Sequence, residues 1–256
     1  MADKYDSVWS SLTRQFIPHL IDDAQVSAGM SVLDVACGPG YVSDAVRKLG
    51  AVPLGIDFSK KMVAIANRMF PGISFAQGDA QDLPYDDASF DRVVINFGLL
   101  HLSHPEQACA EAFRVLKSGG KFGFTVWAQP SQNSGGKIVN DAVETYADLN
   151  VEVPEGPSKF LYAEKQGCWK ALERNGFDGE SMIFETRSAE WDVPTAHYLF
   201  EAERDAGVRT AGLLARQTSD RLDAIMRAIE AGVRRYAKGG RFAIPMAAHI
   251  IVVSKN

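Results

Sequence analysis

The sequence is poor in cysteine and in long apolar runs. Its three cysteines, Cys37, Cys109 and Cys168, are far apart and form no C-x-x-C pair, so we expect no disulfide and no metal site, but buried thiols in a reducing cytoplasm. The longest apolar run, VVINFGLLHL, is too short and too interrupted to span a bilayer. The first residues, MADKYDSVWS, contain no apolar stretch typical of a signal peptide. These absences favour a cytoplasmic protein with no membrane span.

The sequence also lacks an excess of positive charge. The formal net charge is -5 over 256 residues, which argues against a dedicated nucleic-acid binder, because such proteins usually present a basic face. Hydrophobic residues make up 46% and charged residues 23%, as in a globular protein with a substantial core. We therefore expect a single domain over residues 1–256.

Strand and helix patterns alternate through the first half of the chain. The apolar segments MSVLDVA, AVPLGIDF, ISFAQGDA, FDRVVINF and KFGFTVWA are typical of buried strands, and amphipathic helical patterns lie between most of them. One of these helices is expected to end at Gly119-Gly120. This alternation predicts an α/β protein with a parallel sheet covered by helices on both faces.

Three segments depart from this alternation. Residues 1–21 have a helical pattern, with a kink or break expected at Pro18. Residues 128–165 are rich in Gly, Ser, Asn and Pro, and residues 189–240 are mostly helical in pattern. Excursions of this length inside a compact domain are usually functional. We interpret the three segments as a substrate-binding cap on a cofactor-binding core of residues 22–127.

The segment VLDVACGPG joins a strand to a helix through a glycine-rich turn, where open parallel sheets bind ligands. A dinucleotide site needs G-x-G-x-x-G, but Ser43 stands where the third glycine would be. The Asp34 carboxylate would also repel a pyrophosphate, by roughly 4 kcal/mol at about 4 Å and an effective dielectric of 20. A nicotinamide dehydrogenase is therefore disfavoured. Unless Asp34 merely caps the following helix, the ligand should carry an ammonium or sulfonium group beside a nucleoside.

Further residues at the predicted strand ends suit that nucleoside. Asp57 ends the second strand at the spacing where a carboxylate takes ribose hydroxyls. Asp79 can accept the exocyclic amine of adenine, and the Ala80 N–H can donate to a ring nitrogen. Phe58 and Met62 can sandwich the base. The alternative for Asp57 and for Asp79 is that the carboxylate only stabilises a turn. The alternative for Phe58 is an ordinary position in the core.

The segments VLDVACGPG, GIDFSKKM, GDAQDLPYDDASFDRVV, NFGLLHL and EAFRVLKSGGKF occur in this order. Together they resemble the successive motifs of class I S-adenosylmethionine-dependent methyltransferases, above all the small-molecule branch that includes the ubiquinone/menaquinone C-methyltransferases. The resemblance covers residues 30–127. It implies a Rossmann-like methyltransferase fold: a doubly wound, mostly parallel seven-stranded sheet with an antiparallel last strand, here carrying a helical cap.

The resemblance also implies S-adenosyl-L-methionine as the cofactor and assigns residues to it. These are Asp34, Ala36, Gly38 and Gly40 around the methionine part, Asp57 at the ribose, Phe58 and Met62 on the adenine, Asp79 and Ala80 at its edge, and Asn96 near the sulfonium and amino group. Ala36 departs from the family, which often has glycine there. We expect this alanine to tighten the turn without abolishing binding.

Transfer of a sulfonium methyl is an in-line displacement, so the enzyme mainly has to align the reacting groups. A general base helps only where the nucleophile carries a proton. His101 is the best-placed base, and a structural role for it is equally open. Tyr5, Trp9, Trp127 and Tyr162 are candidates for the wall of an acceptor pocket, with ordinary packing as the alternative for each.

The resulting hypothesis is methyl transfer to a carbon, oxygen or nitrogen of a small aromatic or apolar molecule. The alternative is a non-catalytic S-adenosylmethionine-binding protein with a regulatory or assembly role. We expect a small-molecule partner and no nucleic acid. The amphipathic helix predicted near residues 220–236 could also serve a homo-oligomer. The identity of the acceptor does not follow from the sequence.

Overall fold

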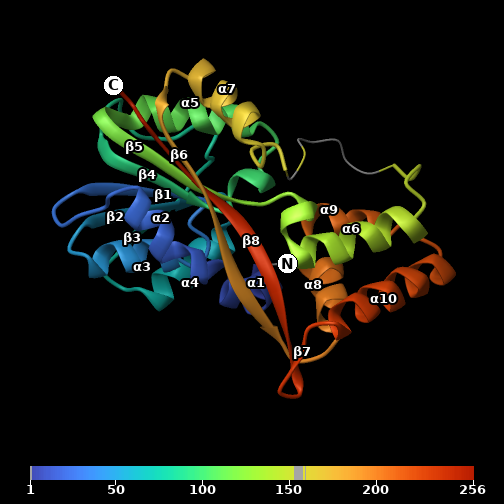
Figure 1. Ribbon diagram of the computed structural model, residues 1–256. Helices are drawn as coiled ribbons and strands as arrows, with labels where there is room; N and C mark the ends of the chain where they lie inside the picture. Colours follow the sequence, from blue (N-terminus) through green and yellow to red (C-terminus); the bar gives the residue numbers. More distant parts are fainter. Residues whose placement is uncertain (1, 153–157, 159) are drawn as a thin grey trace.

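The computed structural model describes residues 2–152, 158 and 160–256, with the side chains of residues 2–7, 208 and 209 left aside. One mixed sheet organises the chain (Figure 1). Its strands are β1 (Ser31–Val35), β2 (Val52–Asp57), β3 (Ser74–Gln77), β4 (Phe90–Asn96), β5 (Leu116–Trp127), β6 (Asp178–Val193), β7 (Ala237–Lys238) and β8 (Arg241–Ser254).

The sheet has the order β3-β2-β1-β4-β5-β8-β6, with β7 paired to β8. The first five strands in this order are parallel, and β8 runs antiparallel to both β5 and β6. This confirms the expected doubly wound, mostly parallel sheet of seven main strands with an antiparallel last strand. Its parallel strands carry the loops at their carboxyl ends to one edge, where ligands bind in such folds.

Helices cover both faces of the sheet. They are α1 (Ala2–Thr13), α2 (Ile17–Asp23), α3 (Tyr41–Lys48), α4 (Lys60–Met69), α5 (Pro105–Val115), α6 (Ser134–Tyr146), α7 (Lys165–Arg174), α8 (Tyr198–Ala206), α9 (Val208–Leu214) and α10 (Ser219–Arg234), with short 3-10 turns η1 (Arg14–Phe16), η2 (Leu99–His101) and η3 (Pro130–Gln132). One core cluster joins the sheet to α1, α2, α3, α6, α8 and α10, and a second joins the opposite face to α5 and α7.

The N-terminal helical stretch breaks where proline predicted it. α1 ends at Thr13, η1 follows, and α2 begins at Ile17 with Pro18 in its first turn, where the missing N–H costs nothing. The buried Arg92 of β4 donates to the carbonyl oxygens of Ala24 (2.6 Å) and Gln25 (3.3 Å) at the end of α2. This contact fixes the N-terminal segment against the sheet.

Two expected boundaries are wrong. α5 ends at Val115, before the glycines at 119 and 120, because Leu116 already pairs with Phe90 of β4 and begins β5. Residues 189–193, expected within a helical segment, belong to β6. β6 and β8 are 16 and 14 residues long, and they run past the rest of the sheet toward β7 (Figure 1).

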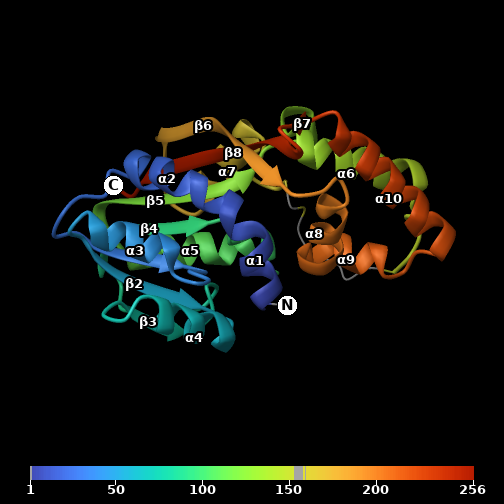
Figure 2. The ribbon, with the colours of Figure 1, turned by 90° about the horizontal axis from the view of Figure 1, so that it is seen from below.

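The extension of β6 and β8 supports the helices that lie outside residues 22–127. Figures 1 and 2 show α6, α8, α9 and α10 gathered beside it, on the side away from α3 and α4. Trp191 and Val193 of β6 and Ile244 and Met246 of β8 are buried in the same core cluster as α8 and α10. A strand ladder therefore carries these helices.

All three cysteines are buried and unpaired, as expected. Among the described residues, no helix has the length and apolar character needed to cross a membrane.

Candidate functional site

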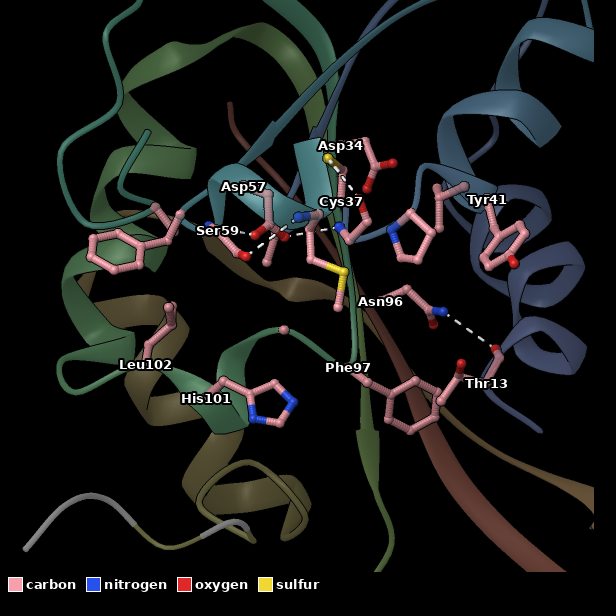
Figure 3. A pocket seen from close by; sticks show the side chains of 18 of the residues that line it. Thr13, Asp34, Cys37, Tyr41, Asp57, Ser59, Asn96, Phe97, His101 and Leu102 are labelled. Atoms are coloured by element: carbon pink, nitrogen blue, oxygen red, sulfur yellow. Dashed lines mark hydrogen bonds between the residues drawn. The ribbon is translucent and has the colours of Figure 1, made fainter. Parts of the chain in front are cut away.

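A pocket of about 670 Å³ lies at the carboxyl ends of β1, β2, β3 and β4 (Figure 3). The loops after these strands form one wall, and the N-terminal segment with α8 forms the other. The pocket brings together nine of the ten residues predicted to bind the cofactor, and His101 with them: Asp34, Ala36, Gly38, Asp57, Phe58, Met62, Asp79, Ala80, Asn96 and His101. The facing wall contains Ser10, Thr13, Arg14, Ile17 and Ala206.

Gly40 is the predicted residue that does not line the pocket. It precedes α3 with φ 89°, and a Cβ there would lie 2.7 Å from the Phe75 ring. Its place in the motif is explained by the turn and by this close approach. Gly38, at φ 53°, has open space where a Cβ would be, so the backbone is accessible to a ligand at that point.

Ala36 also adopts a left-handed conformation, with φ 53°. A Cβ in this region costs roughly 1–2 kcal/mol. Gly98 accommodates the methyl group of Ala36, because a Cβ on Gly98 would lie 2.7 Å from the Ala36 Cβ. The alanine therefore keeps the backbone shape that glycine would give, at a cost in strain.

Asp34 is almost fully buried at the end of β1. Its Oδ2 accepts hydrogen bonds from the Ser43 hydroxyl (2.6 Å) and the Ser43 N–H (3.0 Å) in the first turn of α3. The carboxyl thus bonds to the start of the helix and also borders the pocket. Burial raises the pKa of Asp34 to about 7, although the bonds from Ser43 act in the opposite direction. The carboxyl is therefore only partly ionised near neutral pH, and a nearby cation would favour its charged form.

Asp57 connects two of the loops. Its Oδ2 accepts from the Gly38 N–H and its Oδ1 from the Ser59 N–H, both at 2.8 Å. Burial raises the pKa of this carboxyl, against these two bonds. Each oxygen keeps a further lone pair, and the residue borders the pocket.

Asp79 anchors the loop after β3. Its Oδ1 accepts from the Gln81 N–H (2.9 Å) and side-chain amide (3.1 Å). The Gln81 Oε1 in turn accepts from the Ser103 hydroxyl and the His104 N–H. This network joins the loop after β3 to the residues that directly follow η2, the turn that ends at His101.

Phe58 and Met62 differ in exposure. Phe58 is 74% exposed at the pocket, whereas Met62 is buried. A core position for Phe58 is thereby excluded. Its exposed ring is available for stacking on a flat ligand.

Asn96 is the last residue of β4, and the nitrogen and oxygen of its side-chain amide differ in their hydrogen bonding. Its Nδ2 donates to the Thr13 carbonyl at 3.3 Å, as Figure 3 shows. Its Oδ1 is buried and has no hydrogen-bond partner among the described residues. A buried acceptor of this kind suits a ligand that brings a donor.

His101 lies in η2 and its ring borders the pocket. Desolvation by the surrounding protein lowers the pKa of the His101 imidazole to about 4, although part of the side chain is exposed. The imidazole is therefore neutral near pH 7. It can accept a proton in that form, as a weak base.

The structure describes the side chains of three of the four aromatic candidates for an acceptor wall, and all three are engaged in packing. Trp9 is buried with its ring centroid 4.7 Å from that of Trp191, and Trp127 packs 4.2 Å from Phe97. Tyr162 lies in the other core cluster. None of the three lines the pocket, because their rings are used in packing. The side chain of Tyr5 lies outside the described residues.

Sequence reasoning missed Arg14 and Tyr41. Both line the pocket, and the Arg14 guanidinium lies 4.3 Å from the centroid of the Tyr41 ring. Tyr41 opens α3 and Arg14 comes from η1. No local motif marks this pair, since it depends on how the N-terminal segment folds over the sheet.

A profile of the methyltransferase domain matches residues 33–124. A demethylmenaquinone methyltransferase of Paenarthrobacter aurescens is 37% identical over 175 residues, which cover 66% of this chain and 69% of that protein. The chain belongs to the class I S-adenosylmethionine-dependent methyltransferases. A demethylmenaquinone methyltransferase of Renibacterium salmoninarum is 38% identical over 135 residues, covering 51% of this chain and 57% of that protein. The chain thus spans about half to two thirds of the length of such relatives.

Solved structures show the same fold along most of the methyltransferase chain. The YcgJ protein of Bacillus subtilis aligns with a TM-score of 0.59 and 20% identity, over 94% of this chain and 98% of that one. A phosphoethanolamine N-methyltransferase of Haemonchus contortus, solved with S-adenosylhomocysteine, gives 0.56 and 16%, over 99% of this chain and 56% of that one. At these identities the likeness establishes the fold alone.

Proposed function

We propose that this protein transfers the methyl group of S-adenosylmethionine to a small, mainly apolar acceptor held between the strand ends and the N-terminal segment. One observation carries the proposal. One pocket unites acidic residues at the ends of neighbouring strands with a facing wall in which α1, α2 and α8 contribute uncharged side chains and η1 contributes Arg14. The acidic side suits a cofactor that carries a cation and a ribose, and the facing wall suits an apolar acceptor.

The residues present fit the cofactor. Asn96 Oδ1 is a buried acceptor without a partner among the described residues, which suits an ammonium donor. Arg14 would pair with the carboxylate of the methionine part, and Asp57 with the ribose hydroxyls. Phe58 and Met62 would enclose the adenine, with Asp79 and Ala80 at its edge.

When bound, S-adenosylmethionine supplies an activated methyl group. The chain would then contribute orientation: well-aligned groups reach effective molarities of roughly 10⁵–10⁸ M. The N-terminal segment would help to exclude water, since Ser10, Thr13 and Ile17 line the wall opposite the strand ends. The neutral His101 would receive a proton if the attacking atom carries one.

The acceptor wall favours an apolar ring. Ile17 and Ala206 of the facing wall, together with Phe97 and Leu102 after β4, line the pocket with apolar side chains. The Thr13 hydroxyl donates to the Trp9 carbonyl and can still accept a hydrogen bond. Relatives are named demethylmenaquinone methyltransferases, so a quinone-derived aromatic ring is the first acceptor class to test. A carbon, oxygen or nitrogen of such a molecule would receive the methyl group.

We also propose that residues 22–127 form the cofactor-binding core, to which Arg14 adds one contact, and that residues 1–21, 128–165 and 189–240 shape the acceptor site, within one domain. Four residues of the N-terminal segment, Ser10, Thr13, Arg14 and Ile17, and Ala206 of α8 line the pocket directly. The described part of 128–165 contributes indirectly, because α6 packs on α10 and β8. This arrangement supports a cap built around the N-terminal segment and α8.

Calorimetry followed by a transfer assay tests the function. We expect S-adenosylmethionine to bind and NADH not to bind. We expect labelled methyl to appear on an aromatic acceptor such as a demethylated quinol. Preferential binding of NADH would overturn the proposal. Tight S-adenosylmethionine binding without transfer to any member of an aromatic acceptor panel would favour the non-catalytic alternative.

Replacing His101 separates its two possible roles. If His101 acts as the base, His101→Ala should lower kcat by about 10²–10⁴ and leave the Kd for S-adenosylmethionine unchanged. His104→Ala, three residues along the same loop, is the matched control. Full activity of His101→Ala would assign the ring a structural role.

A further inference from the structure

Two buried polar atoms lie on the adjacent strands β4 and β5, and one of them belongs to a residue that lines the pocket. Among the described residues, Asn96 Oδ1 and the Thr125 hydroxyl have no hydrogen-bond partner. Asn96 and Thr125 are paired Cα positions in the register of β4 and β5. Paired positions on neighbouring strands point to the same face of a sheet, so the two side chains emerge side by side.

Thr125 has an apolar environment. It is completely buried, and its register partner on β8 is Ile250, a member of the core cluster beneath α1 and α2. A buried polar group without a partner is destabilising, because it loses its hydrogen bonds to water. Valine has nearly the same shape and would avoid that cost. The hydroxyl therefore calls for a partner, and Asn96 is the polar residue at the paired position of β4.

The other contact of Asn96 sets the orientation of its amide. The Thr13 carbonyl can only accept, so the atom facing it at 3.3 Å is Nδ2. The oxygen is then the amide atom left for other partners. An amide oxygen accepts two hydrogen bonds, which allows one from Thr125 and one from a ligand.

We propose that Thr125 is a positioning residue for cofactor binding. Its hydroxyl donates to Asn96 Oδ1 in the bound state and holds the amide plane, so that the second lone pair of Oδ1 receives the amino group of S-adenosylmethionine. Thr125 is buried beneath the pocket and does not line it, so it acts through Asn96. This inference rests on the proposed function and names a residue outside the sequence motifs.

A double-mutant cycle with calorimetry tests the proposal. The Kd for S-adenosylmethionine is measured for wild type, Thr125→Val, Thr125→Ser, Asn96→Ala and the double variant Asn96→Ala/Thr125→Val. We expect Thr125→Val to weaken binding about tenfold. Without the hydroxyl, the Asn96 amide would no longer be held in the orientation that accepts a hydrogen bond from the charged amino group of the cofactor. Thr125→Ser should restore binding to within about twofold, because it keeps the hydroxyl. The double variant should match Asn96→Ala alone.

Thermal unfolding separates positioning from folding. Thr125→Val should melt at or above the wild-type temperature, since it removes a buried hydroxyl that has no partner among the described residues. If this variant does not fold, Thr125→Ala takes its place in the cycle. A wild-type Kd in Thr125→Val, or in Thr125→Ala where that variant takes its place, overturns the inference. An additive loss of affinity in the double variant overturns it as well. Wild-type protein that binds no S-adenosylmethionine would instead refute the proposed function itself.

Discussion

The two walls of the pocket are built in different ways. On the strand-end wall, hydrogen bonds hold the polar side chains: Asp34 bonds to Ser43, and Asp57 bonds to two backbone N–H groups. The facing wall comes from helices that pack on the sheet, and Asn96 joins it through one bond of 3.3 Å to Thr13. The contrast indicates a preorganised cofactor side, and an acceptor side whose shape depends on helix packing.

Removing Asp57 should give the largest effect and would break the strand-end wall. Asp57→Ala removes the acceptors of the ribose hydroxyls and of the Gly38 and Ser59 N–H groups. At about 1.5–3 kcal/mol per bond to a charged group, the Kd for S-adenosylmethionine should rise at least 100-fold by calorimetry. Asp86→Ala changes an exposed acid outside the pocket and is the control. A Kd within twofold of wild type would remove Asp57 from the ribose site.

Replacing Arg14 tests whether the facing wall also contacts the cofactor. Arg14→Ala would remove the proposed partner of the cofactor carboxylate, and we expect a loss of about tenfold in affinity, as for one bond involving a charged group. Arg14→Lys should recover only part of it, because lysine lacks the planar fork. The measurement is again the Kd for S-adenosylmethionine, beside a melting curve. Unchanged binding in Arg14→Ala would confine cofactor recognition to the strand ends.

A point substitution is a better probe of this wall than a deletion. Removing residues 1–15 would also take away Trp9 and Leu12, which are buried in the core cluster. Such a truncation would lower stability together with turnover. Arg14 is exposed at the pocket, so its replacement leaves the core intact.

The pH dependence of binding probes the buried carboxyl of the strand-end wall. The pKa of Asp34 is raised to about 7 in the free protein. A cationic ligand favours the ionised form, so binding below this pKa must displace a proton. Affinity for S-adenosylmethionine should therefore rise about tenfold between pH 5.5 and pH 7, below the range where a free α-amino group titrates.

Asp34→Asn provides the control for that profile. Asparagine keeps an oxygen that can accept from Ser43, but it does not titrate in this range. Its binding should be weaker and flatter with pH. The pKa of Asp57 is also raised, so any slope that remains in Asp34→Asn would belong to that second carboxyl. An equal slope in both proteins would show that Asp34 does not sense the ligand.

The same contrast separates what could be predicted from sequence and what could not. The strand ends follow from local patterns, and Asp57 and Asp79 do lie at the pocket. The end of α5 depends on the pairing of Leu116 with a distant strand, which no local glycine signal reveals. The side chains of the facing wall depend on which face of each helix packs against the sheet, which the sequence pattern alone does not determine. Aromatic side chains such as Trp9 therefore belong to the core, and Arg14 was missed.

The smallest expected effect concerns the strain in the strand-end turn. Ala36→Gly removes a Cβ from a residue at φ 53°, and we expect a gain in unfolding free energy of at most about 1 kcal/mol, since relief of left-handed strain is offset by the greater freedom of glycine in the unfolded chain. Ala88 has the same φ in an exposed turn outside the pocket, so Ala88→Gly is the matched control for this gain by thermal or denaturant unfolding. The Kd for S-adenosylmethionine should stay within about twofold in both variants, because glycine can keep the same backbone shape. Weaker binding in Ala36→Gly alone would mean that the methyl group of Ala36 contacts the ligand or restricts the backbone of this turn. The strand-end wall would then owe part of its preorganisation to Ala36 as well as to hydrogen bonds.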